Sequence, residues 1–246
     1  MILPISVSIV SHGDGIIVSN LIDDLLECPE IESIILTRNI PEPALGIFAN
    51  KKLIIIENSH PKGFGANHNF AFKHIRTPYF AVLNPDIRIK ENPFPALIDC
   101  LGTSGTALCA PIVLNPAGNL EDSARHFPTP YSLFLKALKI NNGTLKSNQT
   151  RHTGSAPWVA GMFMCFRSMD FSKINGFDEA FFLYYEDVDL CARLWKNGFK
   201  VKLCSSAHVI HDARRASRKN PRHMSWHATS LSRYFMKHFG RLPSID

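Results

Sequence analysis

The stretch PYFAVLNPD, residues 78–86, decides the fold because it is a short apolar run that stops abruptly at Asn-Pro-Asp. The run Tyr79–Leu83 carries no charged side chain, which is typical of a strand covered on both faces in a parallel sheet. Pro85 has no N–H for a sheet ladder, so the strand ends there. Asp86 is then predicted to lie at the carboxyl end of the strand, where open α/β sheets bind ligands.

Predicted strands and helices alternate on both sides of this run. The strands cover residues 5–11, 31–37, 52–58, 78–86 and 107–114, and the helices cover 18–28, 67–75 and 92–101. In the first helix, Ser19 or Asn20 is the expected N-cap. This pattern predicts an α/β fold with a mainly parallel central sheet. Beyond residue 114 the pattern weakens, and we expect helices at 131–140, 186–198 and 226–240 and strands at 158–168 and 199–211.

The composition is that of an ordinary globular protein. The chain has 246 residues, of which 45% are hydrophobic and 20% charged, enough for a substantial core. No apolar run reaches the about 18 residues that span a bilayer, and the N-terminus lacks the features of a signal peptide. We therefore expect a cytoplasmic protein. The six cysteines form no CxxC pair, which favours small buried thiols over a zinc site.

Positive charge is concentrated in the last quarter of the chain. Residues 193–246 hold 12 Lys and Arg against 2 Asp and Glu, a balance of +10, whereas residues 1–192 hold 15 against 19, a balance of −4. Such a segment favours an anionic partner, and the favoured ones are the inner face of the cell membrane, contacted peripherally, or a polyprenyl-diphosphate-linked acceptor. A solvated basic face is the alternative, and it is the more common explanation of a run of charges. Nucleic-acid binding is disfavoured, because the aromatic residues of this segment fit a packed amphipathic helix.

Two loops at predicted strand ends carry residues suited to metal or phosphate chemistry. Asp86 offers a carboxylate to a hard divalent cation, although Asn-Pro-Asp is also an ordinary turn. The loop NSHPKGFGANHNFAF, residues 58–72, has Gly63 and Gly65 for close backbone approach, Lys62 for charge, and a helix N-terminus for an anion. It matches neither GxxxxGK[ST] nor GxGxxG, so its composition alone is a weak signal.

The stretch AFFLYYEDVDLCARLWKNG, residues 180–198, joins a run of aromatic and apolar side chains to three carboxylates. Asp189 can pair with the arginine four residues later, and a helix N-terminus is an adequate structural place for Glu186. Asp187 shares a helix face with apolar residues, and a carboxylate turned inward has a raised pKa suited to a general base. His211 ends a later strand and is a candidate metal ligand, although a single histidine is more often structural.

In order, the chain carries SIVSHGDG, GFGANHN, LNPD, GMFMCFR, GFDEAFFLYYEDVDLCARLWKNGF and a histidine before a basic segment. This series resembles the family 2 inverting glycosyltransferases of bacterial polysaccharide and O-antigen assembly, particularly the rhamnosyltransferase-like branch. The resemblance implies a GT-A fold, a Rossmann-like nucleotide-binding half fused to an acceptor-binding half. One glycosyltransferase domain would then cover residues 1–220, with the nucleotide-sugar half at 1–114 and the acceptor half at 115–220, before a basic helical tail at 221–246.

The resemblance also implies the chemistry of a site. The donor is a nucleotide-diphospho-sugar whose diphosphate is bridged by Mg²⁺ or Mn²⁺. By motif, Asp86 and His211 bind the metal, Asp187 is the general base for the acceptor hydroxyl, and Glu186 orients Asp187. The aromatic wall at 181–185 shapes the acceptor and sugar pocket. By resemblance, the remaining contacts to the donor fall at Ser11, Asn58, Gly63, Phe64, Asn67 and Asn84. Three further candidates come from their own chemistry: Lys62 and Arg215 offer positive charge to the diphosphate, and Asn39 offers an amide at the end of the second strand.

Departures from the family pattern leave the nucleotide base open. The first loop, SHGDG, lacks the usual Thr-Tyr-Asn, and the second strand ends in LTRN where many members have an aspartate that contacts uracil. Either Asn39 substitutes for that aspartate or the base is thymine. The favoured donor is dTDP-rhamnose, and the acceptor is a saccharide or a polyprenyl-diphosphate-linked saccharide.

Three other hypotheses stay open. A galactosyl- or other hexosyltransferase using a UDP-sugar would keep the same site and change only the donor. A catalytically inactive scaffold that binds nucleotide sugars is disfavoured, because Asp86, Asp187 and His211 are all present. A sugar-nucleotide nucleotidyltransferase would need a glycine-rich basic loop after the first strand, and SHGDGIIV has no basic residue.

Overall fold

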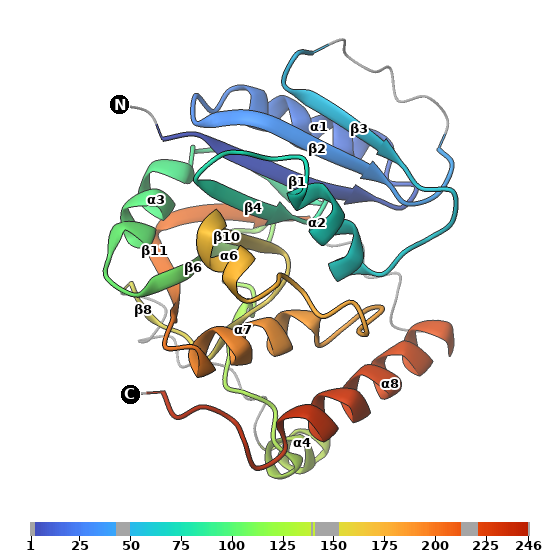
Figure 1. Ribbon diagram of the computed structural model, residues 1–246, viewed down its shortest axis with the longest axis vertical. Helices are drawn as coiled ribbons and strands as arrows, with labels where there is room; N and C mark the ends of the chain where they lie inside the picture. The colour runs from blue at the N-terminus through green and yellow to red at the C-terminus, as the bar shows by residue number, and fades with distance from the viewer. Residues whose placement is uncertain (1–2, 43–49, 139, 141–152, 213–220, 246) are drawn as a thin grey trace.

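The computed structural model describes residues 3–42, 50–138, 140, 153–212 and 221–245. Its centre is a sheet with strand order β3-β2-β1-β4-β10-β6-β11-β5 (Figure 1). The N-terminal half supplies the first four of these strands, all parallel. The elements of this half are β1 Ile5–Ser11, α1 Ile16–Leu26, β2 Ile31–Arg38, β3 Leu53–Glu57, α2 Phe64–Phe72 and β4 Tyr79–Leu83.

The C-terminal half extends the sheet in mixed orientation. β10 runs antiparallel between β4 and β6, whereas β6 and β11 are parallel along a long ladder. The α/β class with a mostly parallel sheet is therefore confirmed. The elements of this half are β5 Ile87–Arg88, α3 Phe94–Gly102, β6 Thr106–Leu114, β7 Ala124–Arg125, α4 Pro130–Ala137, β8 Gly154–Ser155, β9 Trp158–Val159, β10 Phe163–Arg167, α6 Ser168–Lys173, α7 Glu186–Lys196, β11 Lys200–His211 and α8 Pro221–His238.

β4 shows why its sequence is apolar throughout. Its side chains alternate between two core layers, with Phe80 and Val82 packed in one and Ala81 and Leu83 in the other. Helices cover both faces of the strand, so no position can be polar. The ladder ends where the Asn84 N–H donates to the Met162 carbonyl at 2.9 Å. The Asn-Pro-Asp turn consequently leaves the sheet at its carboxyl edge, as predicted.

The predicted strand at 158–168 is wrong as a single element, because the structure has two short strands, β9 and β10, with a break between them. At the break, the Gly161 N–H donates to Asp187 Oδ2 at 3.0 Å instead of joining a ladder. A Cβ at position 161 would lie 3.2 Å from the Phe64 ring. The break between β9 and β10 therefore frees a backbone N–H to bind the Asp187 carboxylate.

Several helices begin earlier than predicted, and α1 and α8 show two different reasons. α1 starts at Ile16 after Gly15, whose φ of +48° suits glycine, and not after Ser19 or Asn20. α8 starts at Pro221, a residue whose fixed φ suits the first turn of a helix. Tyr234 of α8 is fully buried and donates its hydroxyl to the Pro128 carbonyl at 3.1 Å, so the basic C-terminal segment packs on the domain. Among the described helices, none joins the length and apolarity needed to cross a bilayer.

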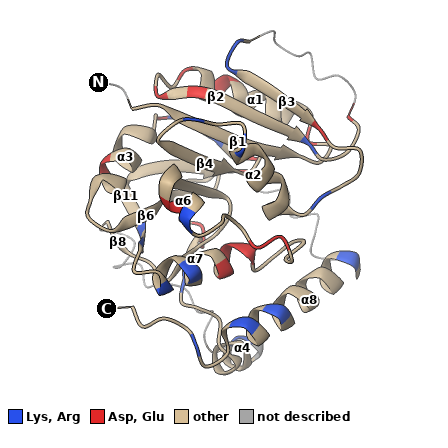
Figure 2. Cartoon of the chain, in the orientation of Figure 1, with Lys and Arg blue, Asp and Glu red and all other residues tan. Residues whose placement is uncertain are grey.

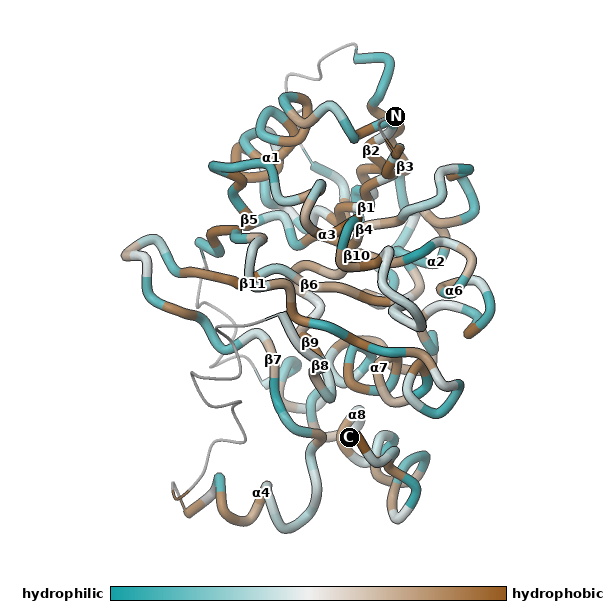
Figure 3. The backbone as a smooth tube through the Cα atoms, turned by 90° about the vertical axis from the view of Figure 1, so that its left-hand side faces the viewer, coloured by the Kyte–Doolittle hydropathy of each residue, from teal (hydrophilic) through white to brown (hydrophobic). Residues whose placement is uncertain are grey.

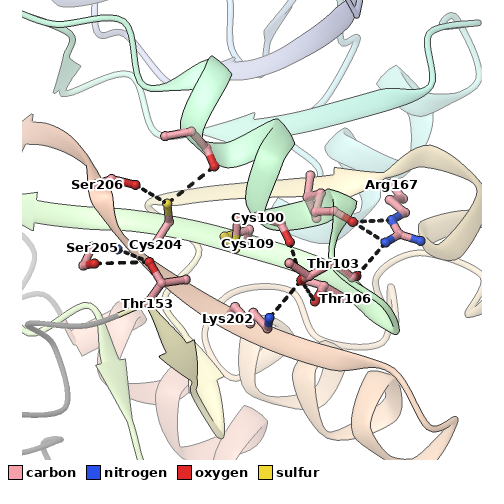
Figure 4. Close-up of a disulfide and its surroundings, with 12 residues drawn as sticks. Cys100, Thr103, Thr106, Cys109, Thr153, Arg167, Lys202, Cys204, Ser205 and Ser206 are labelled. Atoms are coloured by element: carbon pink, nitrogen blue, oxygen red, sulfur yellow. Dashed lines mark hydrogen bonds between the residues drawn. A yellow bond between two sulfur atoms is a disulfide. The ribbon is translucent and has the colours of Figure 1, made fainter.

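The cysteines depart from the expected free thiols at one pair. Cys100 of α3 and Cys109 of β6 form a disulfide, and the Cys204 sulfur of β11 lies beside them (Figure 4). α3 packs across β6, which brings together two cysteines that no short motif links. The prediction of buried free thiols holds for Cys28, Cys165, Cys191 and Cys204.

Candidate active site

A cavity of about 700 Å³ opens at the carboxyl edge of β1, β2 and β4. Open α/β sheets bind ligands at this edge, which the N-terminal sequence pattern predicts. The loop after α6 and one face of α8 close the cavity on the opposite side. We call it the donor cavity. The predicted site residues that line it are Asn39, Lys62, Phe64, Asn67, Asn84 and Asp86.

Three asparagines fix the loop that borders the donor cavity. The Asn58 amide donates to Asn39 Oδ1 at 2.9 Å and to Asn67 Oδ1 at 2.7 Å. Asn39 in turn accepts from the Lys62 N–H at 2.8 Å and donates to its carbonyl at 3.0 Å. Ser11 is fully buried and does not line the cavity, nor does Asn58. The structure thus gives Ser11 and Asn58 positions that support the loops rather than face the cavity.

Gly63 permits a close contact between two loops that are distant in sequence. A Cβ at this position would lie 2.6 Å from the Phe182 carbonyl oxygen, a distance that no side chain tolerates. The next residue, Phe64, donates its N–H to the same carbonyl at 2.9 Å. The loop before α2 and the aromatic loop before α7 are therefore seated directly on each other. The Lys62 ammonium lies 5.0 Å from the centre of the Phe70 ring.

His68 is a residue of the donor cavity that the sequence did not single out. Its ring is fully buried, and its Nδ1 lies 2.8 Å from the Ser8 hydroxyl. Its Nε2 has no hydrogen-bond partner. Burial lowers the pKa of His68 to about 3, so the ring is neutral at physiological pH. The sequence could not predict this position, because apolar and polar residues do not alternate with a clear helical period in α2. Nothing in the pattern therefore indicates that His68 faces the interior.

Asp86 and His211 meet at the rim of the donor cavity, as the resemblance implies. His211 Nε2 lies 3.3 Å from Asp86 Oδ2, and His211 Nδ1 lies 2.6 Å from Glu121 Oε2. A carboxylate only accepts, so Nδ1 carries a proton that it donates to Glu121. Burial opposes charge on the imidazole, but the hydrogen bonds to Asp86 and Glu121 outweigh it and raise the pKa of His211.

This arrangement fits a divalent cation. When the ring is neutral, the Nε2 lone pair of His211 faces an oxygen of the Asp86 carboxylate, and the two repel each other. A cation bound by both atoms would remove this repulsion. Asp86 Oδ1 is buried and has no hydrogen-bond partner. Oxygen and imidazole ligands suit Mn²⁺ or Mg²⁺, and a carboxylate on the far nitrogen is the usual support of a metal-binding histidine. Glu121 lies in irregular chain 90 residues before His211, so no local pattern marks it.

We expect Glu121→Gln to weaken Mn²⁺ binding by about 10- to 100-fold, because the amide removes the charge that holds His211 in its tautomer. Calorimetric titration of Mn²⁺ in the presence of a nucleoside diphosphate measures this. Glu32→Gln makes the same change at the far end of β2 and is expected to have no effect. Unchanged Mn²⁺ affinity in Glu121→Gln would mean that the carboxylate does not support a metal ligand.

The three carboxylates of α7 have different surroundings. Asp189 is fully buried and bonds to Arg193 at 2.7 Å, as predicted, and to His238 at 2.8 Å and Lys237 at 2.7 Å. Burial opposes its charge, but these partners outweigh it and lower the pKa of Asp189 to about 2. It ties α7 to α8 and does not line the donor cavity. Its charge is fully used in these bonds, which leaves Glu186 and Asp187 for chemistry.

Asp187 is held by the backbone. It accepts from the Gly161 N–H at 3.0 Å and from the Val188 N–H at 2.8 Å, and not from Glu186. Burial raises the pKa of Asp187, and these two N–H groups offset part of that rise. Burial and the charge of Asp187 raise the pKa of Glu186 well above its usual range, and Glu186 Oε2 has no partner. Two carboxylates of elevated pKa thus stand side by side, a typical feature of acid–base sites.

A strained turn positions these carboxylates. Tyr184 and Tyr185 precede α7 with φ values of 72° and 65°, the left-handed region that residues other than glycine rarely occupy. Each such residue costs about 1–3 kcal/mol and persists only where the surroundings enforce it. Helix α8 holds the turn in place. The Ser230 hydroxyl donates to the Leu183 carbonyl at 2.9 Å, and His223 Nδ1 lies 2.9 Å from the Tyr184 hydroxyl.

A second cavity, of about 270 Å³, contains both carboxylates and we call it the acceptor cavity. Tyr184 and Tyr185 line it, together with Trp158, Arg125 and residues of α4 and α8. The aromatic wall at 181–185 lies between the two cavities, because Phe182 and Leu183 line the donor cavity. Phe181 departs from the prediction, since it is fully buried in the core. The Arg215 prediction lies outside the described residues.

Comparisons with known proteins agree with the sequence resemblance. Residues 144–216 match a family model described as the N-terminal domain of galactosyltransferase. The chain is 30% identical over 203 residues to rhamnosyltransferase WbbL of Escherichia coli (strain K12), covering 74% of this chain and 76% of WbbL. The chain belongs to the rhamnosyltransferase-like family 2 glycosyltransferases. This glycosyltransferase is also 30% identical over 159 residues to N-acetylglucosaminyl-diphospho-decaprenol L-rhamnosyltransferase of Mycobacterium tuberculosis (strain ATCC 25618 / H37Rv), and it spans about half, 52%, of that relative's length.

Solved structures confirm the GT-A fold of this glycosyltransferase. GalNAc-T7, crystallised with UDP, GalNAc and Mn²⁺, superposes with a TM-score of 0.69 at 15% identity, over 89% of this chain and 45% of its own. TarS of S. aureus superposes with a TM-score of 0.57 at 12% identity, over 95% of this chain and 44% of its own. The mannosyltransferase PcManGT of Pyrobaculum calidifontis, in complex with GDP-Man and Mn²⁺, has a TM-score of 0.58 at 11% identity, over 95% of this chain and 63% of its own.

Proposed function

We propose that this glycosyltransferase transfers rhamnose from a nucleotide-diphosphate donor to a lipid-linked saccharide in bacterial surface polysaccharide synthesis, with inversion at the anomeric carbon. The observation that carries the proposal is the pair of cavities on either side of the loop at 181–185. One contains Asp86, near a carboxylate-supported histidine, and the other contains Asp187. The identity to two proteins named as rhamnosyltransferases supports the choice of sugar.

The donor cavity is proposed to hold the nucleotide diphosphate. Most residues that line this cavity come from residues 1–114. Among them, Asn39, Asn67 and Asn84 would orient the nucleoside and sugar. Asp86 and His211 would hold Mg²⁺ or Mn²⁺. When bound, such an ion neutralises charge that develops on a departing diphosphate. The residues fit this ion because Asp86 keeps an unpartnered buried oxygen and His211 presents Nε2 beside it.

Asp187 is proposed to be the general base. The acceptor hydroxyl oxygen attacks the anomeric carbon, its proton passes to Asp187, and the bond from that carbon to the diphosphate oxygen breaks. Attack from the acceptor cavity, opposite the leaving group, inverts the configuration in one step. A base with a raised pKa suits this role, because its affinity for the proton is closer to that of the attacking oxygen. Glu186, buried beside it with a free oxygen, is proposed to shape the local field and not to bond to Asp187.

Incubation with a donor panel tests the proposal. The panel is dTDP-rhamnose, UDP-galactose, UDP-N-acetylglucosamine and GDP-mannose, each with Mn²⁺ and a sugar-diphospho-lipid acceptor, with transfer followed by mass spectrometry. We expect dTDP-rhamnose to react at least about tenfold faster than any other donor. Faster transfer from a UDP-hexose would favour the alternative hexosyltransferase. Nucleotide binding without transfer from any donor would favour a non-catalytic scaffold.

A further inference from the structure

Helix α4 presents an apolar face that nothing in the described structure covers. Tyr131 is 71% exposed and Phe134 60%, and Leu138, the C-cap residue directly after the helix, is 53% exposed. Their spacing of three and four residues puts them on one side. Leu133 and Lys136, on another side of the same helix, line the acceptor cavity. One helix therefore joins the acceptor cavity to an apolar surface.

Further exposed apolar side chains lie at the end of α8. Met236 is 82% exposed and Phe239 is 69% exposed. A groove of about 370 Å³ runs between the start of α4 and the end of α8, with Phe235 and Leu242 in its lining. Figure 1 and Figure 3 both place α4 beside the C-terminal part of α8, at the lower end of the molecule. We call these exposed side chains the apolar end; its members are Tyr131, Phe134, Leu138, Met236 and Phe239.

The two chain segments that carry the apolar end contain basic and no acidic residues. The sequence has no Asp or Glu from Ser123 to Met169, and none from 213 to 245. Figure 2 shows basic and no acidic residues on α8. Lys136 lies on α4, Arg241 is exposed just after α8, and Arg233 lies on α8. Lys237 is paired with Asp178 and Asp189 on the side of α8 that faces the domain. Exposed apolar side chains on helices that carry basic and no acidic residues are typical of a helix that lies in an anionic membrane interface.

We propose that the apolar end docks on an anionic lipid bilayer, and that this docking sets the acceptor cavity at the headgroup layer. The proposal deepens the proposed function, since it rests on an acceptor that is linked to a lipid. A helix with its side chains is about 10–12 Å across, so α4 would separate the acceptor cavity from the bilayer by about one helix diameter. A second copy of the chain is a weaker candidate, because a two-fold interface would bring the same basic surface against itself.

Vesicle co-sedimentation tests the docking. The probes are vesicles of phosphatidylcholine alone and of phosphatidylcholine with phosphatidylglycerol. The variant is Phe134→Ser with Leu138→Ser, and the matched control is Ile16→Ser, since Ile16 is 68% exposed on α1. We expect the wild type and the control to bind the anionic vesicles in a salt-sensitive way, and the double variant to bind at least about tenfold more weakly.

Transfer assays separate this inference from the proposed function. With a lipid-linked acceptor embedded in anionic vesicles, the double variant is expected to lose rate in parallel with binding, whereas a water-soluble acceptor with a truncated lipid should react at the wild-type rate. Absence of wild-type binding to anionic vesicles, or equal binding by the double variant, would overturn the docking. Self-association of the wild type without vesicle binding would assign the apolar end to a second copy and overturn it too. Vesicle binding without transfer to either acceptor would support the docking and contradict the proposed function.

Discussion

Asp187→Asn is expected to lower the rate of sugar transfer by about 10²- to 10⁴-fold, the usual contribution of a general base. The amide cannot take the proton of the acceptor hydroxyl, although its oxygen can still accept from the Gly161 or the Val188 N–H. Donor binding should be nearly unchanged, because Asp187 lines the acceptor cavity and not the donor cavity. Steady-state kinetics and nucleotide-diphosphate titration of the same preparation give both quantities.

The pH dependence of the wild type provides a further check on this role. Only the ionised form of Asp187 can act as a base, and burial raises its pKa. The rate should therefore fall by about tenfold per pH unit below that pKa, and the fall should begin at a higher pH than the ordinary aspartate value of about 3.9 allows. Asp99→Asn, at an exposed position on α3, is the matched control and should keep the wild-type rate and profile. Loss of donor binding together with a large drop in Tm for Asp187→Asn would instead assign Asp187 a structural role.

Asp86→Ala is expected to abolish the metal-dependent part of nucleotide-diphosphate binding. A ligand at about 100 times its Kd stabilises the folded state by about 2.7 kcal/mol, which a thermal melt resolves readily. The wild type should show a Tm rise with dTDP or UDP that grows when Mn²⁺ is added. In Asp86→Ala the rise should be the same with and without Mn²⁺, because the alanine offers no oxygen to the ion.

Asp23→Ala, an exposed position on α1, is the control for this melt and should behave as the wild type. If Asp86→Ala kept the full Mn²⁺-dependent rise, Asp86 would be only a turn residue at the end of β4. If the wild type responded to no nucleotide in this panel, a nucleotide-sugar donor would itself be contradicted. The two results are distinct, since the first concerns one carboxylate and the second concerns the whole cavity.

The sequence by itself determined the strand-and-helix framework and the positions at which chemistry can occur. The apolar run at 79–83 must be a covered strand, and Pro85 must end it, so Asp86 reaches the ligand edge of the sheet whatever the rest of the chain does. Asp187 follows from helix periodicity in the same way, and the order of the motifs identified the family. Each of these features depends on neighbouring residues or on the order of motifs along the chain, so the sequence alone contains the information needed to predict it.

The tertiary structure alone decided which side chains share a cavity. Glu121 contacts His211 across 90 residues, and Ser230 contacts the Leu183 carbonyl across 47, and no periodicity relates such pairs. The loop composition predicts that Gly63 allows close backbone approach, but only the structure shows that the approaching group is the Phe182 carbonyl of a separate loop. The packing of α8 likewise decides how the aromatic wall is divided. Part of the wall lines each cavity, and Phe181 is buried in the core. Periodicity reports which face of an element is buried, and only the packing of distant elements determines what that face meets.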